Sequence, residues 1–72
     1  MIEGSNFGFA LRELRQEAGL SQRELAERIG STQSAIARME KGEAEPRVST
    51  LEKLAEALNR ELQLHVKVTE PA

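Results

Sequence analysis

Residues 31–38 offer hydrogen-bonding and basic side chains and contain no acidic residue. The polar residues of this run are Ser31, Thr32, Gln33, Ser34 and Arg38, and Lys41 follows after Met39 and Glu40. An amide such as Gln33 can bond adenine N6 and N7 together, and the guanidinium fork of Arg38 matches guanine O6 and N7. These residue types indicate a surface that contacts the base edges and phosphates of a nucleic acid.

The same run lies within a pattern that predicts two short helices crossing at a tight turn. Apolar residues recur at helical spacing on both sides of Gly30, namely Leu25, Ala26 and Ile29 before it and Ile36 and Met39 after it. Gly30 permits the positive φ that ends one helix and redirects the chain. The arrangement is that of a helix-turn-helix, whose second helix lies in the major groove of DNA.

Two further helices are expected around this pair. The first is capped by Ser5 or Asn6 and stops at Gly19, and the last opens at a capping box, Ser49-x-x-Glu52, and carries its apolar face to Leu58. Pro46 marks the loop that precedes the last helix. We therefore expect an all-α, compact four-helix domain over residues 1–60.

After Asn59 the hydrophobic period changes. Leu62, Leu64, Val66 and Val68 alternate with polar residues, which predicts a half-buried β-strand. The rest of the chain offers no partner strand, so we expect residues 61–72 to pair with a second copy of the chain and form a homodimer. A fifth helix or a flexible tail is the alternative.

Composition limits the classes of function. The 72 residues carry a formal net charge of −2, which is unusual for a nucleic-acid binder, so binding to DNA would need charge segregated by face and a dimer to raise affinity. The absence of cysteine excludes a thiolate zinc site and fits a cytoplasmic protein, and no run is apolar and long enough to span a membrane. His65 has no second metal ligand or catalytic partner. We expect no enzyme activity, no cofactor and no metal.

The motifs together resemble the Xre/Cro-type helix-turn-helix family, which includes phage repressor domains. The resemblance runs from Leu11 to Leu58 and is carried by Leu11-Arg-x-Leu-Arg15, Gly19-Leu-Ser-Gln22-x-x-Leu25-Ala26, Gly30-Ser-Thr-Gln-Ser-Ala-Ile36-Ala-Arg-Met-Glu40-Lys-Gly42, Pro46 and Thr50-Leu51-x-x-Leu-Ala55-x-Ala-Leu58. The alternating tail is similar to the ending of small antitoxins of the HigA and HipB sort. The implied fold is a repressor-like bundle, and the implied function is sequence-specific binding of double-stranded DNA.

The resemblance also implies roles for single residues. Base reading falls to Thr32, Gln33, Ser34 and Arg38, and backbone contact to Ser21, Gln22, Lys41 and Arg47. A helix N-terminus such as that at Ser21 and Gln22 offers free N–H groups to a phosphate. Arg15 and Glu40 match a pair that bridges the first and third helices in the family.

Less specific interpretations stay open for several residues. Arg38 can instead contact a phosphate or pair with Glu45, and Arg28 fits an i,i+4 pair with Glu24 on the second helix. The expected function is a homodimeric repressor on a two-fold symmetric operator, most simply the autorepressor of a toxin–antitoxin operon with a toxin as partner. A regulator without a toxin, and a protein-interaction module that has lost DNA binding, are the alternatives.

Overall fold

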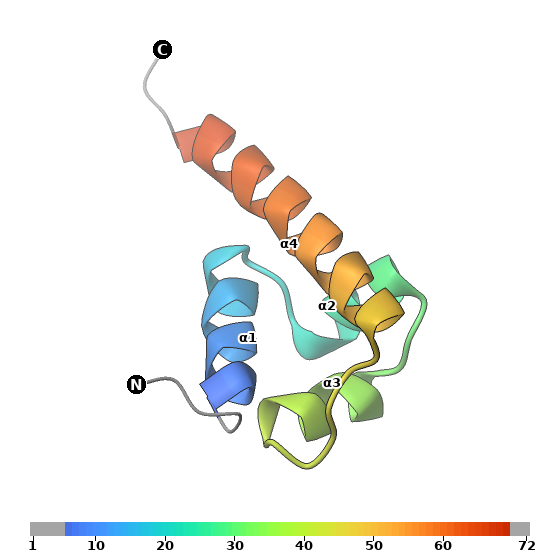
Figure 1. Cartoon of the computed structure of the whole chain (residues 1–72). Helices are drawn as coiled ribbons and strands as arrows, with labels where there is room; N and C mark the ends of the chain where they lie inside the picture. The colour runs from blue at the N-terminus through green and yellow to red at the C-terminus, as the bar shows by residue number, and fades with distance from the viewer. Residues whose placement is uncertain (1–5, 70–72) are drawn as a thin grey trace.

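The computed structural model describes the backbone of residues 6–69 and the side chains of residues 7–64. Within that part of the chain it contains four helices and no strand, as Figure 1 shows. They are α1 (Asn6–Glu17), α2 (Gln22–Ile29), α3 (Gln33–Glu40) and α4 (Val48–Thr69). The prediction of an all-α helical domain is confirmed over these residues. No helix among them is long and apolar enough to cross a membrane.

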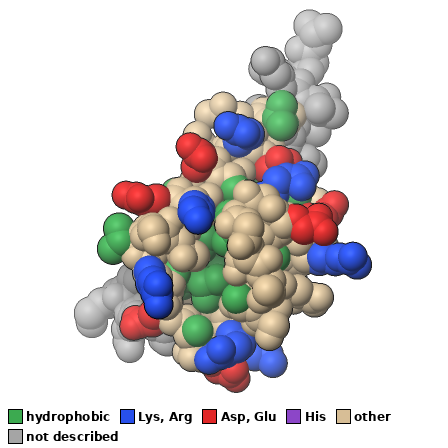
Figure 2. All heavy atoms as spheres, turned by 90° about the vertical axis from the view of Figure 1, so that its right-hand side faces the viewer, with side chains coloured by type: hydrophobic (Ala, Val, Ile, Leu, Met, Phe, Trp, Pro, Cys, Tyr) green, Lys and Arg blue, Asp and Glu red, His purple; other side chains and the backbone are tan. Residues whose placement is uncertain are grey.

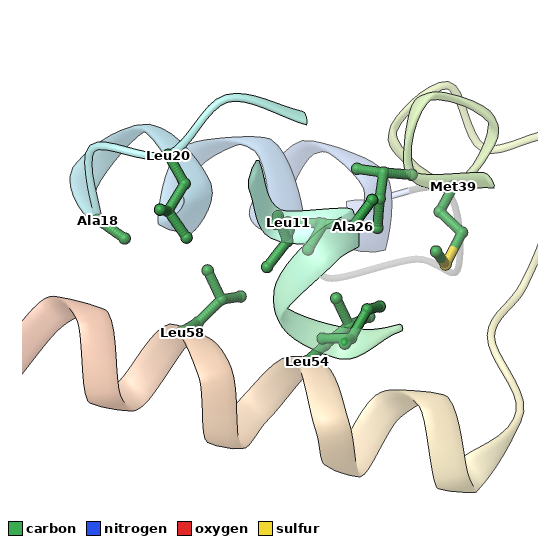
Figure 3. Packing of buried hydrophobic residues seen from close by; sticks show 10 residues of the cluster. Leu11, Ala18, Leu20, Ala26, Met39, Leu54 and Leu58 are labelled. Carbon is green, nitrogen blue, oxygen red and sulfur yellow. The ribbon is translucent and has the colours of Figure 1, made fainter. Parts of the chain in front are cut away.

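One hydrophobic core joins the four helices. Its members come from every helix and from the loop after α1, and they are Leu11, Ala18, Leu20, Leu25, Ala26, Ile29, Ile36, Met39, Leu54 and Leu58. Figure 3 shows Leu54 and Leu58 pointing from α4 towards the other helices. The largest side chains that are fully buried are Leu25, Ile36 and Leu54, so α2, α3 and α4 each contribute one. Burial of such side chains is what holds these short helices in place, because helices of eight residues are not stable alone.

Helix α1 approaches α3 more closely than a side chain would allow. A Cβ atom built on Gly8 would lie 2.7 Å from the carbonyl oxygen of Met39 and closer still to that of Glu40. Both carbonyls belong to the last turn of α3. Gly8 therefore sets the distance between these two helices.

The predicted C-terminal strand is wrong. Helix α4 continues through the alternating segment to Thr69, and Figure 1 shows its last turns extending beyond the other three helices. No glycine or proline interrupts residues 48–69, so each added residue extends the existing helix by one hydrogen bond. A strand would instead leave its backbone groups without partners. The helix also runs without a break across residues 60 and 61, between the expected helical domain and the expected pairing segment.

Tertiary contacts favour this continuation. Leu62 packs partly buried against the core, and Glu61 accepts a hydrogen bond from Arg28 Nε at 3.2 Å. Both contacts require residues 61 and 62 to follow Leu58 on the helical path. In a helix, residues two apart lie on different faces, so Leu62 and Leu64 do not share one apolar face.

Candidate nucleic-acid interface

The start of α2 is fixed by local hydrogen bonds. The Ser21 hydroxyl accepts from the Glu24 backbone N–H at 3.0 Å, and the Glu24 carboxylate accepts from the Ser21 backbone N–H at 2.8 Å. The hydrogen bond from the Ser21 backbone lowers the pKa of Glu24 most, followed by that from the Ser21 hydroxyl. This is the capping box that the sequence predicts, and it sets where α2 begins.

The turn between α2 and α3 depends on Gly30. Its φ is 69°, a left-handed conformation, and the next N–H, that of Ser31, donates to the Ala26 carbonyl at 2.8 Å. Thr32 then caps α3, because its hydroxyl accepts from the Ala35 N–H at 3.1 Å. The turn residues therefore fix the angle at which α3 leaves α2.

Helix α3 divides its side chains between the core and the solvent. Ile36, Met39 and Glu40 are buried against the other helices. The polar residues that the sequence predicts to read bases are all exposed, namely Thr32, Gln33, Ser34 and Arg38. The structure brings them together along the first two turns of α3, on the side away from the core. Such a helix can present side chains to a groove without losing its packing.

Basic residues near α3 are available for an anionic partner. Among the described side chains, no carboxylate forms an ion pair with Arg38, Lys41 or Arg47. Arg38 and Arg47 both line a hollow of about 270 Å³ between α3 and the loop that leads to α4, and Glu45 lines it as well. The interpretation of Arg38 as a partner of Glu45 gains no support here.

Charge is mixed on the face of the molecule that Figure 2 shows. Figure 2 shows hydrophobic side chains at the centre of the face, with lysine and arginine side chains around them and acidic ones between. The face shown therefore carries side chains of both charges. Contacts from individual arginines would have to supply the attraction to phosphates there.

A buried ion pair links α1 to the end of α3. Arg15 Nε donates to Glu40 Oε2 at 2.6 Å and Arg15 Nη2 donates to Oε1 at 3.2 Å. The Glu40 side chain is 0% exposed, and that of Arg15 is 11% exposed. A second guanidinium, that of Arg12, has its Nε 3.6 Å from Glu40 Oε1. Burial raises the pKa of Glu40, but hydrogen bonds from Arg15 and Gln22 and the charge of both arginines outweigh it, so the pKa lies below its ordinary value.

Gln22 connects this pair to the exposed end of α3. Its Nε2 donates to Glu40 Oε1 at 3.0 Å, and its Oε1 accepts from Gln33 Nε2 at 3.5 Å. Three helices thus contribute to one chain of contacts that begins at Arg15 and ends at Gln33. The resemblance to the family predicts that Gln22 contacts a phosphate, and nothing in the sequence indicated that Gln22 binds Glu40.

Of the i,i+4 ion pairs that the sequence suggested on α2, the one at Arg23 is present and the one at Arg28 is not. Arg28 reaches across to Glu61 of α4 instead of pairing with Glu24, and Arg23 pairs with Glu27 at 3.7 Å. Glu24 is held in the capping box. Helical spacing alone could not separate these options, because the partner of Arg28 lies 33 residues away.

The residues predicted for dimerisation lie on α4. Leu62 packs partly against the core, and Leu64 is 52% exposed. Val66, Val68 and His65 have side chains outside the part of the chain that the structure describes. Of the four predicted positions, Leu64 is therefore the one with a demonstrated exposed side chain.

Comparison with known protein families assigns the chain to one of them. The model of a family described as "Helix-turn-helix" matches residues 11–64, which include most of α1, all of α2 and α3 and most of α4. The chain belongs to this helix-turn-helix family, and the resemblance to Xre/Cro-type proteins is confirmed.

Relatives of known name are transcriptional regulators and an antitoxin. An uncharacterized HTH-type transcriptional regulator of Methanothermobacter thermautotrophicus is 47% identical over 51 residues, which are 71% of this chain and 74% of that protein. The HTH-type transcriptional regulator PuuR of Escherichia coli is 50% identical over 52 residues, 72% of this chain and 28% of that protein. Antitoxin HigA1 of Mycobacterium tuberculosis is 41% identical over 59 residues, 82% of this chain and 40% of that protein. This chain therefore spans most of the first relative but less than half of the other two.

Proposed function

We propose that this chain binds double-stranded DNA in a sequence-specific manner and represses transcription. The observation that carries the proposal is the outward face of α3, where Gln33 and Ser34 in the first turn and Arg38 in the last turn are exposed. Gly30 and Thr32 fix where this helix begins. A capped helix with such a face has the form that reads a major groove. The names of the relatives, all regulators or an antitoxin in the cases given above, support the same function.

Two kinds of contact divide the work at the interface. Thr32, Gln33, Ser34 and Arg38 are proposed to read bases. Ser21, Gln22, Lys41 and Arg47 are proposed to contact the DNA backbone. Ser21 and Gln22 lie at the N-terminus of α2, where the helix dipole and free N–H groups favour a phosphate.

A homodimer on a two-fold symmetric operator completes the proposal. The net charge of −2 and the mixed charge on the face in Figure 2 weaken the attraction of a single subunit to DNA phosphates. A second subunit would engage its half-site at high effective concentration and so raise the affinity. The projecting end of α4, with Leu64 exposed, is the proposed interface, through helices in place of the strand pairing expected from the sequence.

An antitoxin that represses its own operon is the proposed biological role. The likeness to antitoxin HigA1 over 82% of this chain supports it. A general regulator without a toxin is the second candidate, because the similarity to PuuR and to the archaeal regulator is of the same order. Co-expression with the product of the adjoining gene, followed by co-purification, tests the difference: a stable complex with a growth-inhibiting protein supports the antitoxin role, and no complex supports the regulator.

DNA binding itself is tested by selection from random duplexes and gel shifts at two salt concentrations. We expect one enriched two-fold symmetric sequence and weaker binding at higher salt. Arg47→Ala should weaken binding to selected and random DNA alike and lower the salt slope by about one. Lys53→Ala is the matched control, because it removes one positive charge from the α4 face that adjoins α2. Enrichment of no sequence would show that the domain is a protein-interaction module.

A further inference from the structure

Glu40 is the only charged residue that is buried among the residues the structure describes. Its carboxylate accepts hydrogen bonds from Arg15 Nε, Arg15 Nη2 and Gln22 Nε2, at 2.6, 3.2 and 3.0 Å. Arg15 already supplies two charge-assisted bonds and the opposite charge that a buried carboxylate requires. The bond from the neutral Gln22 amide is therefore an additional contact. The other end of the same amide faces Gln33 at the start of α3.

The charge of Glu40 determines which way the Gln22 amide faces. An ionised carboxylate only accepts hydrogen bonds, whereas an amide has an accepting oxygen at one end and a donating NH₂ group at the other. Gln22 must therefore turn its NH₂ group to Glu40 and its oxygen away. That oxygen lies 3.5 Å from Gln33 Nε2, so it accepts from Gln33 in turn. The direction of each bond follows from the bond before it.

We propose that Glu40 is a positioning residue for base recognition, acting through Gln22 to set which hydrogen-bonding groups Gln33 presents to DNA. With one N–H directed to Gln22, Gln33 has its oxygen and its second N–H left for a base. That pair of groups matches the N6 donor and N7 acceptor of adenine. This inference rests on the proposed DNA-binding function and adds a residue that does not itself touch DNA, since the Glu40 side chain is 0% exposed.

A neutral side chain at position 40 would remove this control. The amide of Glu40→Gln can donate as well as accept, so the Gln22 amide can face either way. Where Gln22 turns its NH₂ group to Gln33, Gln33 would turn its oxygen to Gln22 and its NH₂ group outward. Bases with the opposite donor and acceptor pattern would be tolerated at the same position.

The test compares base discrimination in four variants of the full chain. A duplex enriched by the wild-type chain from random DNA is the probe, and Gln33→Ala identifies the base pair at which discrimination depends on Gln33. All four base pairs are then tried at that position with Glu40→Gln and Gln22→Ala. Gln22→Ala breaks the chain of contacts without leaving a buried charge unpaired, so it decides the matter even where Glu40→Gln does not fold. Leu58→Ala, which shortens an apolar side chain of the core that takes no part in these hydrogen bonds, is the control for lowered stability.

We expect the wild-type preference for adenine at that position to be about tenfold and to fall below about threefold in both Glu40→Gln and Gln22→Ala. Leu58→Ala should keep the preference at a temperature where circular dichroism shows it folded. Retained discrimination in either folded test variant overturns the proposal, and so does an equal loss in Leu58→Ala. Selection of no sequence by the wild-type chain overturns the proposed function instead, before any variant is compared.

Discussion

Among single residues, we expect the Arg15–Glu40 ion pair to contribute most to the stability of the fold. The two groups are joined by hydrogen bonds of 2.6 and 3.2 Å and are almost fully removed from water. Removal of one partner of such a pair leaves the other charge buried and uncompensated. Arg12, at 3.6 Å, keeps half of its side chain in solvent and cannot replace Arg15.

We therefore expect Arg15→Ala to lower the free energy of unfolding by about 3 kcal/mol or more. Urea unfolding followed by circular dichroism measures the change. Arg23→Ala is the control, because it breaks an exposed pair with Glu27 and should cost less than about 1 kcal/mol. Equal, small losses in both variants would show that the Arg15–Glu40 pair contributes no more than a surface pair.

The lowered pKa of Glu40 also makes stability depend on pH. Burial alone would raise this pKa, but the bonds from Arg15 and Gln22 prevail, so the folded chain binds its proton less readily than the unfolded chain does. The contribution is complete above the ordinary value of 4.5 and is lost as pH falls through the folded pKa. Glu24 acts in the same direction through its bonds to Ser21.

We accordingly expect the urea midpoint of the wild-type chain to fall as pH is lowered below 4.5. Glu24→Gln should retain part of that fall, because Glu40 is still ionisable in it. A direct check is the titration of the Glu40 carboxyl carbon by NMR, with a midpoint below 4.5. A midpoint above that value would contradict the prediction.

At the scale of elements, the contact between α1 and α3 depends on Gly8. Alanine inside an exposed helix is normally more stable than glycine by about 1 kcal/mol. At Gly8 the added methyl group would meet the carbonyl oxygens of Met39 and Glu40, and backbone atoms cannot move aside as a flexible side chain can.

Gly8→Ala should therefore reverse the usual sign and lower stability by about 1–3 kcal/mol. Thermal unfolding of Gly8→Ala and of the wild-type chain measures this. Ala10→Gly, at an exposed position of the same helix, controls for helix propensity and should cost about 1 kcal/mol. A rise in the melting temperature of Gly8→Ala would show that α1 and α3 can separate at little cost.

At the scale of the whole molecule, the proposed dimer depends on the end of α4. Leu64 is half exposed beyond the core, on a helix that projects past the other three. Exposed leucines alone are common, so the position on the projecting segment is what favours Leu64 as a contact. Leu62 is less suitable for a test, because it packs partly on the core.

We expect Leu64→Lys to shift a dimer to monomer in sedimentation and to weaken operator binding, while helix content stays unchanged, because a charge would be buried without a partner. Leu14→Lys, at an exposed apolar position of α1, is the matched control and should stay dimeric. A dimer that survives Leu64→Lys but not Leu14→Lys would move the interface to α1.

The features of this protein that short-range signals encode could be predicted from its sequence. Gly30 and Thr32 set the turn and the start of α3, and the capping box at Ser21 sets the start of α2, because each acts within a few residues. The family and the outward polar face of α3 follow from the same local spacing. These are the features that make the chain recognisable as a helix-turn-helix protein.

The other features could not be predicted, because they depend on contacts between residues that are far apart in the sequence. The segment after Asn59 alternates like a strand, yet Leu62 on the core and Glu61 on Arg28, 33 residues away, hold it in α4. The bond between Gln22 and Glu40 spans 18 residues and has no signal in the spacing of either helix. A pattern can rank the local conformations of a segment, but packing and charge compensation across the core select among them.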